Sequence, residues 1–89
     1  MKVITKIEAA KGKVVYSLFS EKTGSTVEYG IVVKSELFGD AEESKIYNIT
    51  SEPDFAGRLL FTLADNLVLP STAAEVVEEY LAAHFTVNN

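Results

Sequence analysis

Apolar and polar residues alternate along the first half of the chain, whereas apolar residues recur every three or four positions along the second half. A period of two is typical of half-buried strands, and the longer period is typical of amphipathic helices. The pattern therefore predicts three to four strands followed by two helices. The expected strands cover about residues 2–9, 13–20, 26–38 and 45–49, the expected helices cover about 52–66 and 73–84, and a tail covers 85–89.

Consecutive strands followed by consecutive helices indicate an α+β fold. We expect an antiparallel meander with both helices packed on one of its faces, an arrangement written ββββαα. The 89 residues suit a single domain spanning 1–89. A chain of this length buries a core of only modest size, so most of its apolar residues are needed for stability.

The strand expected over 13–20 is apolar on both of its sides, so the pattern leaves its buried side open. The segment KVVYSLFS is rich in β-branched and aromatic residues, which favour strands. One side carries Val14, Tyr16 and Leu18, and the other side carries Val15 and Phe19. Whichever set turns away from the core adds apolar surface to the outside of the sheet.

The strand expected over 26–38 has a clear core side. Its apolar residues on one side are Val27, Tyr29, Ile31, Val33 and Leu37, and the other side is marked by Thr26, Glu28, Lys34 and Glu36. Gly30 lies inside this strand. A glycine in a strand interior predicts a β-bulge or a close approach of another group to the backbone.

The string Lys22-Thr23-Gly24 resembles one element of the penicillin-binding and β-lactamase active site. That site also needs a Ser-x-x-Lys nucleophile and a Ser-Asp-Asn partner, and neither occurs in this chain. Gly24 lies between two alternating segments, where a hairpin loop of three to five residues requires a positive φ. We therefore interpret the string as a turn.

Both helices begin at sequences that resemble N-terminal caps. Ser51 is expected to cap the first helix, with Asp54 completing a capping box and Pro53 in the first turn. Thr72 is expected to cap the second helix, with Glu75 three residues later. The apolar stripes consist of Phe55, Leu59, Leu60, Leu63 and Leu67, and of Ala73, Val76, Val77, Tyr80 and Leu81.

Charge and composition narrow the classes of partner. The net charge is −5, and residues 39–89 carry nine acidic residues against Lys45 and Arg58. An acidic surface repels phosphate, so nucleic acid is not an expected partner. The chain has no cysteine for disulfides or thiolate zinc sites and no apolar stretch long enough to span a membrane. The N-terminus lacks a signal-peptide core, and we expect a soluble, cytoplasmic protein.

No group of residues has the spacing of a known catalytic or metal site. His84 is the only histidine, and its spacing from Glu78 and Glu79 differs from that of helical metal ligands. Glu75, Glu78 and Glu79 are expected to form the solvated outer face of the second helix. We therefore assign no catalytic, cofactor-binding or metal-binding residue, and we expect no cofactor.

Three segments carry a resemblance to a known family: TVEYGIVV over 26–33, IYNITSE over 46–52 and LPSTAAEVVEEYL over 69–81. Together they resemble a family of small uncharacterised bacterial proteins from Firmicutes, catalogued as a domain of unknown function (DUF6514). The shared features are a Tyr-Gly-Ile strand, an Ile-Thr entry to a helix, and an acidic closing helix that follows a proline. The resemblance implies no activity, so it assigns no functional residue.

These features favour a non-enzymatic protein-interaction module that self-associates through the exposed sheet face. Helices cover only one face of a sheet, and apolar residues grouped on the other face usually mark a partner surface. The candidate surface comprises Val14, Tyr16, Leu18 and Val32, and the expected partner is a second copy of the chain or another protein. The alternative is a small-ligand-binding protein or minor enzyme with a pocket between sheet and helices, lined by Tyr29, Tyr47 and Phe55.

Overall fold

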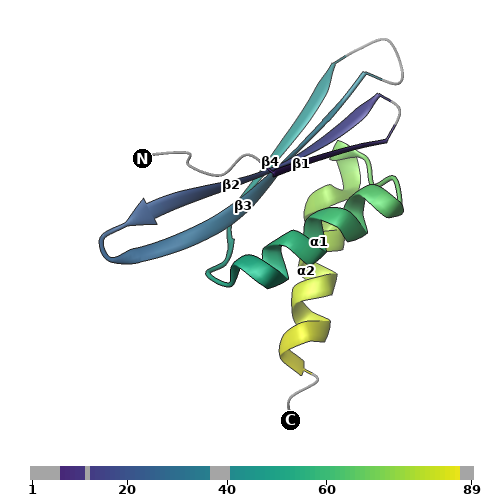
Figure 1. Cartoon of the computed structure of the whole chain (residues 1–89). Coiled ribbons are helices and arrows are strands. Elements are labelled where there is room, and N and C mark those ends of the chain that lie inside the picture. Colours follow the sequence, from purple (N-terminus) through teal and green to yellow (C-terminus); the bar gives the residue numbers. More distant parts are fainter. Residues whose placement is uncertain (1–6, 12, 37–40, 87–89) are drawn as a thin grey trace.

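The computed structural model describes residues 7–11, 13–36 and 41–86. An antiparallel sheet carries two helices on one of its faces (Figure 1). The strands are β1 (Ile7–Lys11), β2 (Val14–Thr23), β3 (Thr26–Ser35) and β4 (Glu42–Thr50), and they lie side by side in that order. The helices are α1 (Pro53–Asp65) and α2 (Pro70–Thr86). The predicted α+β class, an antiparallel sheet followed by two helices, is confirmed.

The hairpin between β2 and β3 fixes which side of each strand faces the helices. Thr23 pairs with Thr26, so the loop contains only Gly24 and Ser25, and Gly24 has a φ of +62°. The predicted turn is confirmed, but its loop is shorter than the three to five residues expected. Glycine at the first loop position is typical of a type II′ turn, whose twist suits a two-residue hairpin.

This register places Leu18 opposite Ile31 and Tyr16 opposite Val33, and all four residues lie on the face covered by the helices. Val14, Tyr16 and Leu18 are 0%, 0% and 2% exposed. The assignment of these three residues to an exposed partner surface is therefore wrong, because they form the centre of the core. The set that turns away from the helices contains Val15 and Phe19.

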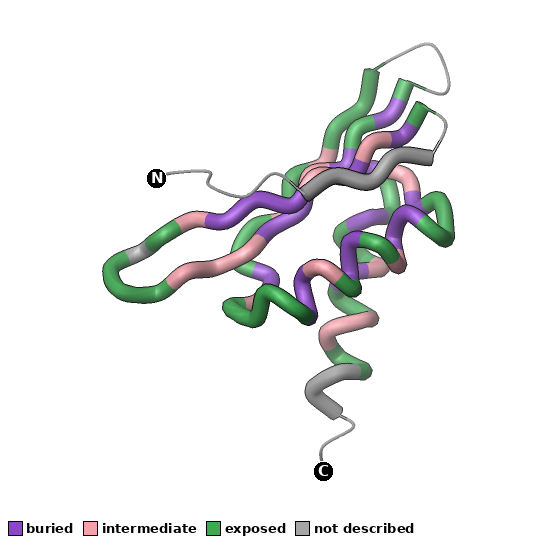
Figure 2. Tube along the Cα trace, in the orientation of Figure 1, coloured by how far each residue is buried: buried purple, intermediate pink, exposed green. Residues whose placement is uncertain are grey.

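The core lies between the sheet and the two helices. Helix α1 packs across the sheet, and α2 packs mainly on β4. Figure 2 shows buried residues where these layers meet, and exposed residues at the tip of the β2–β3 hairpin. As predicted, Val77 is buried, while Glu75, Glu78 and Glu79 are exposed. The buried residues of the core cluster are Val14, Tyr16, Leu18, Ile31, Val33, Ile49, Ala56, Leu59, Leu60, Leu63, Ala64, Val68, Ala73 and Val77.

Neither predicted capping box forms. Helix α1 starts at Pro53, and its N-cap is Glu52, which makes no side-chain capping bond. The Thr50 hydroxyl instead accepts a hydrogen bond from the Glu52 N–H at 3.1 Å, and this turn takes the place of the predicted Ser51 cap. Proline suits the first helical position because its missing N–H has no partner there anyway.

Helix α2 begins three residues earlier than the predicted Ala73, because Pro70 starts it. Thr72 is therefore inside the first turn, where its hydroxyl donates to the Leu69 carbonyl at 3.4 Å instead of capping the helix. The helix continues through Thr86, so two residues of the predicted tail are helical. Predictions that fall on 2–6, 37–40 and 87–89 lie outside the described residues.

A tight turn joins the two helices and anchors them to the sheet. Leu67 has a φ of +50°, the Leu67 N–H donates to the Ala64 carbonyl at 3.1 Å, and the Val68 N–H donates to the Leu63 carbonyl at 3.0 Å. This pair of bonds is a Schellman motif, which ends α1. It places the Val68 carbonyl where the buried hydroxyl of Tyr16 donates to it at 2.8 Å. Sequence reasoning missed this bond, which joins residues 52 positions apart.

In the part of the chain that the structure describes, neither helix combines the length and the apolar character needed to cross a bilayer.

Candidate functional site

The face of the sheet that the helices leave uncovered is the first candidate surface. Alternation along β2 turns Val15, Ser17, Phe19 and Glu21 to this side, and the register adds residues of the neighbouring strands. We call this surface the open face. Its members are Val15, Ser17, Phe19, Glu21, Glu28, Gly30, Val32, Lys34, Glu43, Lys45 and Tyr47. Of the four residues predicted as a partner surface, Val32 alone lies here.

An aromatic pair occupies the middle of the open face. Phe19 lies opposite Gly30, and a Cβ built on Gly30 would be 2.4 Å from the Phe19 ring. The ring therefore occupies the space that a side chain at position 30 would need. Tyr47 packs against Phe19 edge to face, with the ring centroids 5.5 Å apart. Phe19 is 7% exposed and Tyr47 is 49% exposed, so the pair presents mainly the tyrosine to solvent.

Gly30 also faces an irregularity in β4. Tyr29 pairs with Thr50 and Ile31 pairs with Ile46, so β4 has two more residues than β3 at this point. Asn48 takes up the extra length with a φ of +54°. Asparagine adopts this conformation more readily than most residues. Both interpretations of Gly30 are confirmed, because the site is a bulge and also a close approach of the Phe19 ring and the Ile46 carbonyl.

Charged residues divide the open face along the strand direction. Glu21 lies directly opposite Glu28 at the hairpin end. Lys34 lies toward the other end, with Glu43 opposite it, and Lys45 lies opposite Val32, next to the centre of the face. Directly opposed like charges on neighbouring strands destabilise a sheet. The open face therefore has an acidic end, a mainly apolar centre with Lys45 beside it, and an end where Lys34 lies opposite Glu43.

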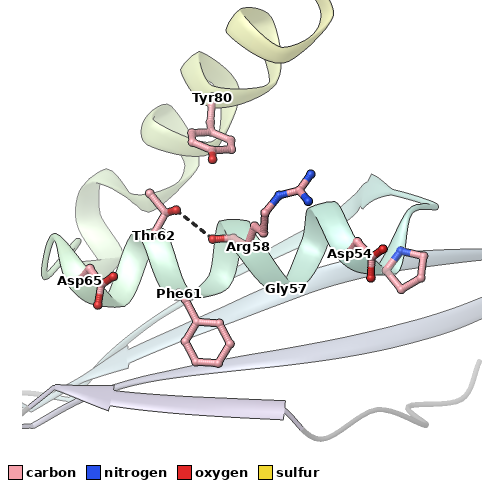
Figure 3. A pocket seen from close by; sticks show the side chains of 8 residues that line it. Asp54, Gly57, Arg58, Phe61, Thr62, Asp65 and Tyr80 are labelled. Carbon is pink, nitrogen blue, oxygen red and sulfur yellow. Dashed lines mark hydrogen bonds between the residues drawn. The ribbon is translucent and has the colours of Figure 1, made fainter.

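The second candidate surface is a shallow groove of about 540 Å³ on the outer side of α1. Figure 3 shows its lining residues along α1, with the ring of Tyr80 from α2 directed toward this helix. Arg58, Asp54 and Asp65 are exposed on α1. The groove is lined by Pro53, Asp54, Gly57, Arg58, Phe61, Thr62, Asp65 and Tyr80. No sequence pattern singled out this side of α1, because Gly57 and Phe61 lie outside the predicted apolar stripe of the helix.

The predicted ligand pocket between the sheet and the helices is not assembled from the expected residues. Tyr29 is half-buried on the helix-covered face, and Phe55 is buried on α1. Tyr47 lies on the opposite side of the sheet, against Phe19. Three aromatic residues separated by a sheet cannot line one pocket.

The remaining candidate residues do not converge either. Glu75, Glu78 and Glu79 stay on the exposed side of α2, and the side chain of His84 lies outside the described residues. Within the described part of the chain, no three histidine, aspartate or glutamate side chains are grouped as metal ligands. The Lys22-Thr23-Gly24 string forms the end of β2 and the first loop residue of the hairpin.

Comparison with known proteins identifies the family. A family model described as a family of unknown function, DUF6514, matches residues 1–83. The chain belongs to this family. The match confirms the resemblance and extends it from the segments that suggested it to nearly the whole chain. No curated protein and no solved structure matches the chain.

Proposed function

We propose that the protein is a non-enzymatic interaction module that forms a two-fold dimer through the open face. The observation that carries the proposal is the arrangement of this face, which has an acidic pair at one end, a mainly apolar centre with Lys45 beside it, and Lys34 toward the other end. The partner is a second copy of the chain, because the open face is complementary to itself under one particular two-fold rotation.

The geometry of this rotation follows from the positions on β3. Glu28 and Lys34 are six residues apart, or about 20 Å along the strand, and the midpoint between them is Ile31. A two-fold axis that lies in the interface and crosses the strands here reverses the strand direction of the second copy. The acidic end of each copy then faces Lys34 of the other copy, and Lys45 lies within one residue of the axis.

The apolar residues occupy the centre of such an interface. Val32 and Phe19 lie within one or two residues of the axis, and Tyr47 covers Phe19. Apolar groups at the centre with charged groups around them are typical of specific protein interfaces. Lys34 of the second copy also offsets the repulsion between Glu21 and Glu28.

The size of the open face suits this role. Strands about 4.8 Å apart and about 30 Å long give the sheet a projected area of roughly 600 Å². A standard interface buries about 800 Å² of accessible surface on each partner. The projected area of the sheet is about three quarters of this value, which suits a small two-fold interface.

Light scattering coupled to size-exclusion chromatography tests the proposal. The expected mass is twice the 9.7 kDa of the chain. Replacing both glutamates in Glu21→Lys plus Glu28→Lys brings lysine against lysine and is expected to give monomers. Adding Lys34→Glu reverses the charge that faces them and is expected to restore the dimer.

Phe61→Ser, on the outer side of α1, is the matched control and is expected to leave the mass unchanged. A wild-type mass of 9.7 kDa at micromolar concentration contradicts self-association. A dimer that is insensitive to the charge reversals places the interface elsewhere and contradicts the role of the open face.

A further inference from the structure

Gly57 lies in the middle of α1 although the fold does not require a glycine there. A Cβ at this position would meet no atom within 4 Å. Glycine in a helix interior is less favourable than alanine, because it loses more backbone freedom on folding. The other two glycines with described surroundings have a structural reason, since Gly24 has a positive φ and Gly30 is covered by Phe19. At Gly57 the described part of the chain supplies no such reason.

Gly57 is part of the lining of the groove on the outer side of α1 (Figure 3). A glycine on a helix surface lets another backbone approach closely, because no side chain stands between the two. Phe61, one turn further along the helix, is 50% exposed and supplies apolar contact area beside this point. The ring of Tyr80, which packs on Phe55 with centroids 5.7 Å apart, borders the groove from α2.

The charges of the groove indicate the chemistry of its occupant. Asp54 and Asp65 lie at its two ends, eleven residues or about 16 Å apart along the helix. Arg58 lies between them, and only one other cation, Lys45, occurs among residues 39–89. The Thr62 hydroxyl donates to the Arg58 carbonyl at 2.8 Å, so its proton already has a partner. The groove thus offers carboxylates at both ends, with Arg58 on one side of its middle and the apolar surface of Gly57 and Phe61 on the other.

We infer that the groove binds an amphipathic helix of a partner protein, with basic residues at both ends of its apolar face. A spacing of about 16 Å corresponds to three helical turns. An apolar stripe at i, i+3, i+4 and i+7 is about 10.5 Å long, so it fits between two basic residues at that spacing. A small molecule fits less well, because a ligand on the outer side of one helix leaves much of its surface in water. This inference does not depend on the dimer proposed for the open face.

Fluorescence anisotropy with a labelled model helix tests the inference. The probe is an 18-residue peptide with leucines at helical spacing on one face and lysines elsewhere, and the comparison peptide carries glutamate in place of lysine. The lysine peptide is expected to bind and the glutamate peptide is not. Gly57→Leu fills the point of close approach and is expected to weaken binding by about tenfold or more. Gly57→Ala is expected to weaken it by about threefold while raising the melting temperature.

Ala74→Leu is the matched control, because Ala74 is an exposed residue of α2 outside the groove. It introduces a leucine, as Gly57→Leu does, and is expected to leave the affinity for the lysine peptide unchanged. Asp54→Asn plus Asp65→Asn is expected to weaken binding of the lysine peptide more than Glu78→Gln plus Glu79→Gln. The second pair changes the same amount of charge outside the groove and thereby measures general attraction to an acidic surface.

Three results overturn the inference: no binding of the lysine peptide, equal binding to the Gly57→Leu variant, or equal effects of the two charge pairs. Amide chemical-shift changes locate the peptide independently. They are expected around Gly57, Phe61 and Tyr80, and changes confined to Val15, Val32 and Tyr47 place the peptide on the open face instead.

Discussion

The two faces of the sheet receive apolar side chains from the same strand, yet only one face is buried. On the covered face Tyr16 and Leu18 are 0% and 2% exposed. On the open face Val15 and Val32 stay half-buried, and Phe19 is shielded by Tyr47. Strand β2 therefore does not decide which face becomes the core.

The neighbouring strand β3 determines which face becomes the core. On the covered side β3 contributes Ile31 and Val33 next to β2, whereas on the open side it contributes Gly30, Val32 and Lys34. A charged residue and a missing side chain prevent the open side from forming a continuous apolar surface. The comparison teaches that a strand with apolar residues on both sides, such as β2, is oriented by its register with a neighbour that is continuously apolar on one side only, such as β3.

The largest effect on stability is expected for a core residue of β3, and the adjacent residue on the open face serves as its comparison. Val33→Asp buries a carboxylate in the core and is expected to cost about 4 kcal/mol or more. That is enough to unfold a domain whose free energy of unfolding is about 5 kcal/mol. Val32→Asp lies on the open face opposite Lys45 and is expected to cost less than about 1 kcal/mol in the monomer. Urea unfolding followed by circular dichroism measures both. Equal losses contradict the assignment of the two faces.

The next effect concerns the glycine that holds the aromatic pair on the open face. In Gly30→Ala the new Cβ would lie 2.4 Å from the Phe19 ring and 2.5 Å from the Ile46 carbonyl. The carbonyl belongs to the backbone and cannot move freely, so we expect a loss of about 2–3 kcal/mol. Gly57→Ala, with no atom within 4 Å, is expected to gain about 0.5–1 kcal/mol. Thermal melts of the two variants distinguish a required glycine from a dispensable one.

The sequence nearly predicts which side of β2 faces the core. The one missing quantity is the length of the loop between β2 and β3. The alternation of Val27, Tyr29, Ile31 and Val33 had identified the core side of β3. A two-residue loop pairs Ile31 with Leu18, whereas a three-residue loop would pair it with Ser17 and turn the other side of β2 inward. One additional residue in the loop therefore reverses the prediction of which side of β2 faces the core.

Other features depend on contacts between distant parts of the chain. The Tyr16 hydroxyl donates a hydrogen bond to the Val68 carbonyl, 52 positions away in the sequence, and no local pattern predicts this bond. The groove on α1 likewise depends on where α2 places Tyr80. The capping boxes failed for a different reason, because Pro53 and Pro70 occupied the first helical positions and shifted both starts. Local signals identified the helices but not their first residues.

A smaller effect tests the polar bond on the covered face. Tyr16→Phe removes the hydroxyl and leaves the buried Val68 carbonyl without its partner. We expect a loss of about 1–2 kcal/mol in urea unfolding. Ring packing is preserved, so the near-ultraviolet spectrum of the folded variant is expected to lose only the contribution of one tyrosine. A loss below the error of the measurement contradicts a structural role for this bond.

The same residue gives the covered face a dependence on alkaline pH. Burial raises the pKa of Tyr16 above its usual value of 10.0, because the charged phenolate is poorly solvated in the core. The stability that this shift contributes is fully present below pH 10 and is lost as the pH rises toward the pKa of the folded state. Wild type is therefore expected to lose more stability than Tyr16→Phe between pH 9 and pH 11 in matched thermal melts. Equal losses contradict a buried hydroxyl.

The smallest effect on stability is expected at two residues with a positive φ, one near each face of the sheet. Leu67, in the turn that supports the covered face, has a φ of +50°, and Asn48, in the bulge beside the open face, has a φ of +54°. Leucine is strained in this conformation by about 1–2 kcal/mol, whereas asparagine adopts it at lower cost. Leu67→Gly removes the strain but makes the unfolded chain more flexible, so we expect a net gain of about 0.5 kcal/mol. Asn48→Gly is expected to give no gain, and Leu67→Ala keeps the strain and serves as the control for loss of the side chain. If Leu67→Gly and Leu67→Ala unfold at the same urea concentration, the left-handed turn is not strained, and the Schellman motif holds the Val68 carbonyl over Tyr16 without cost.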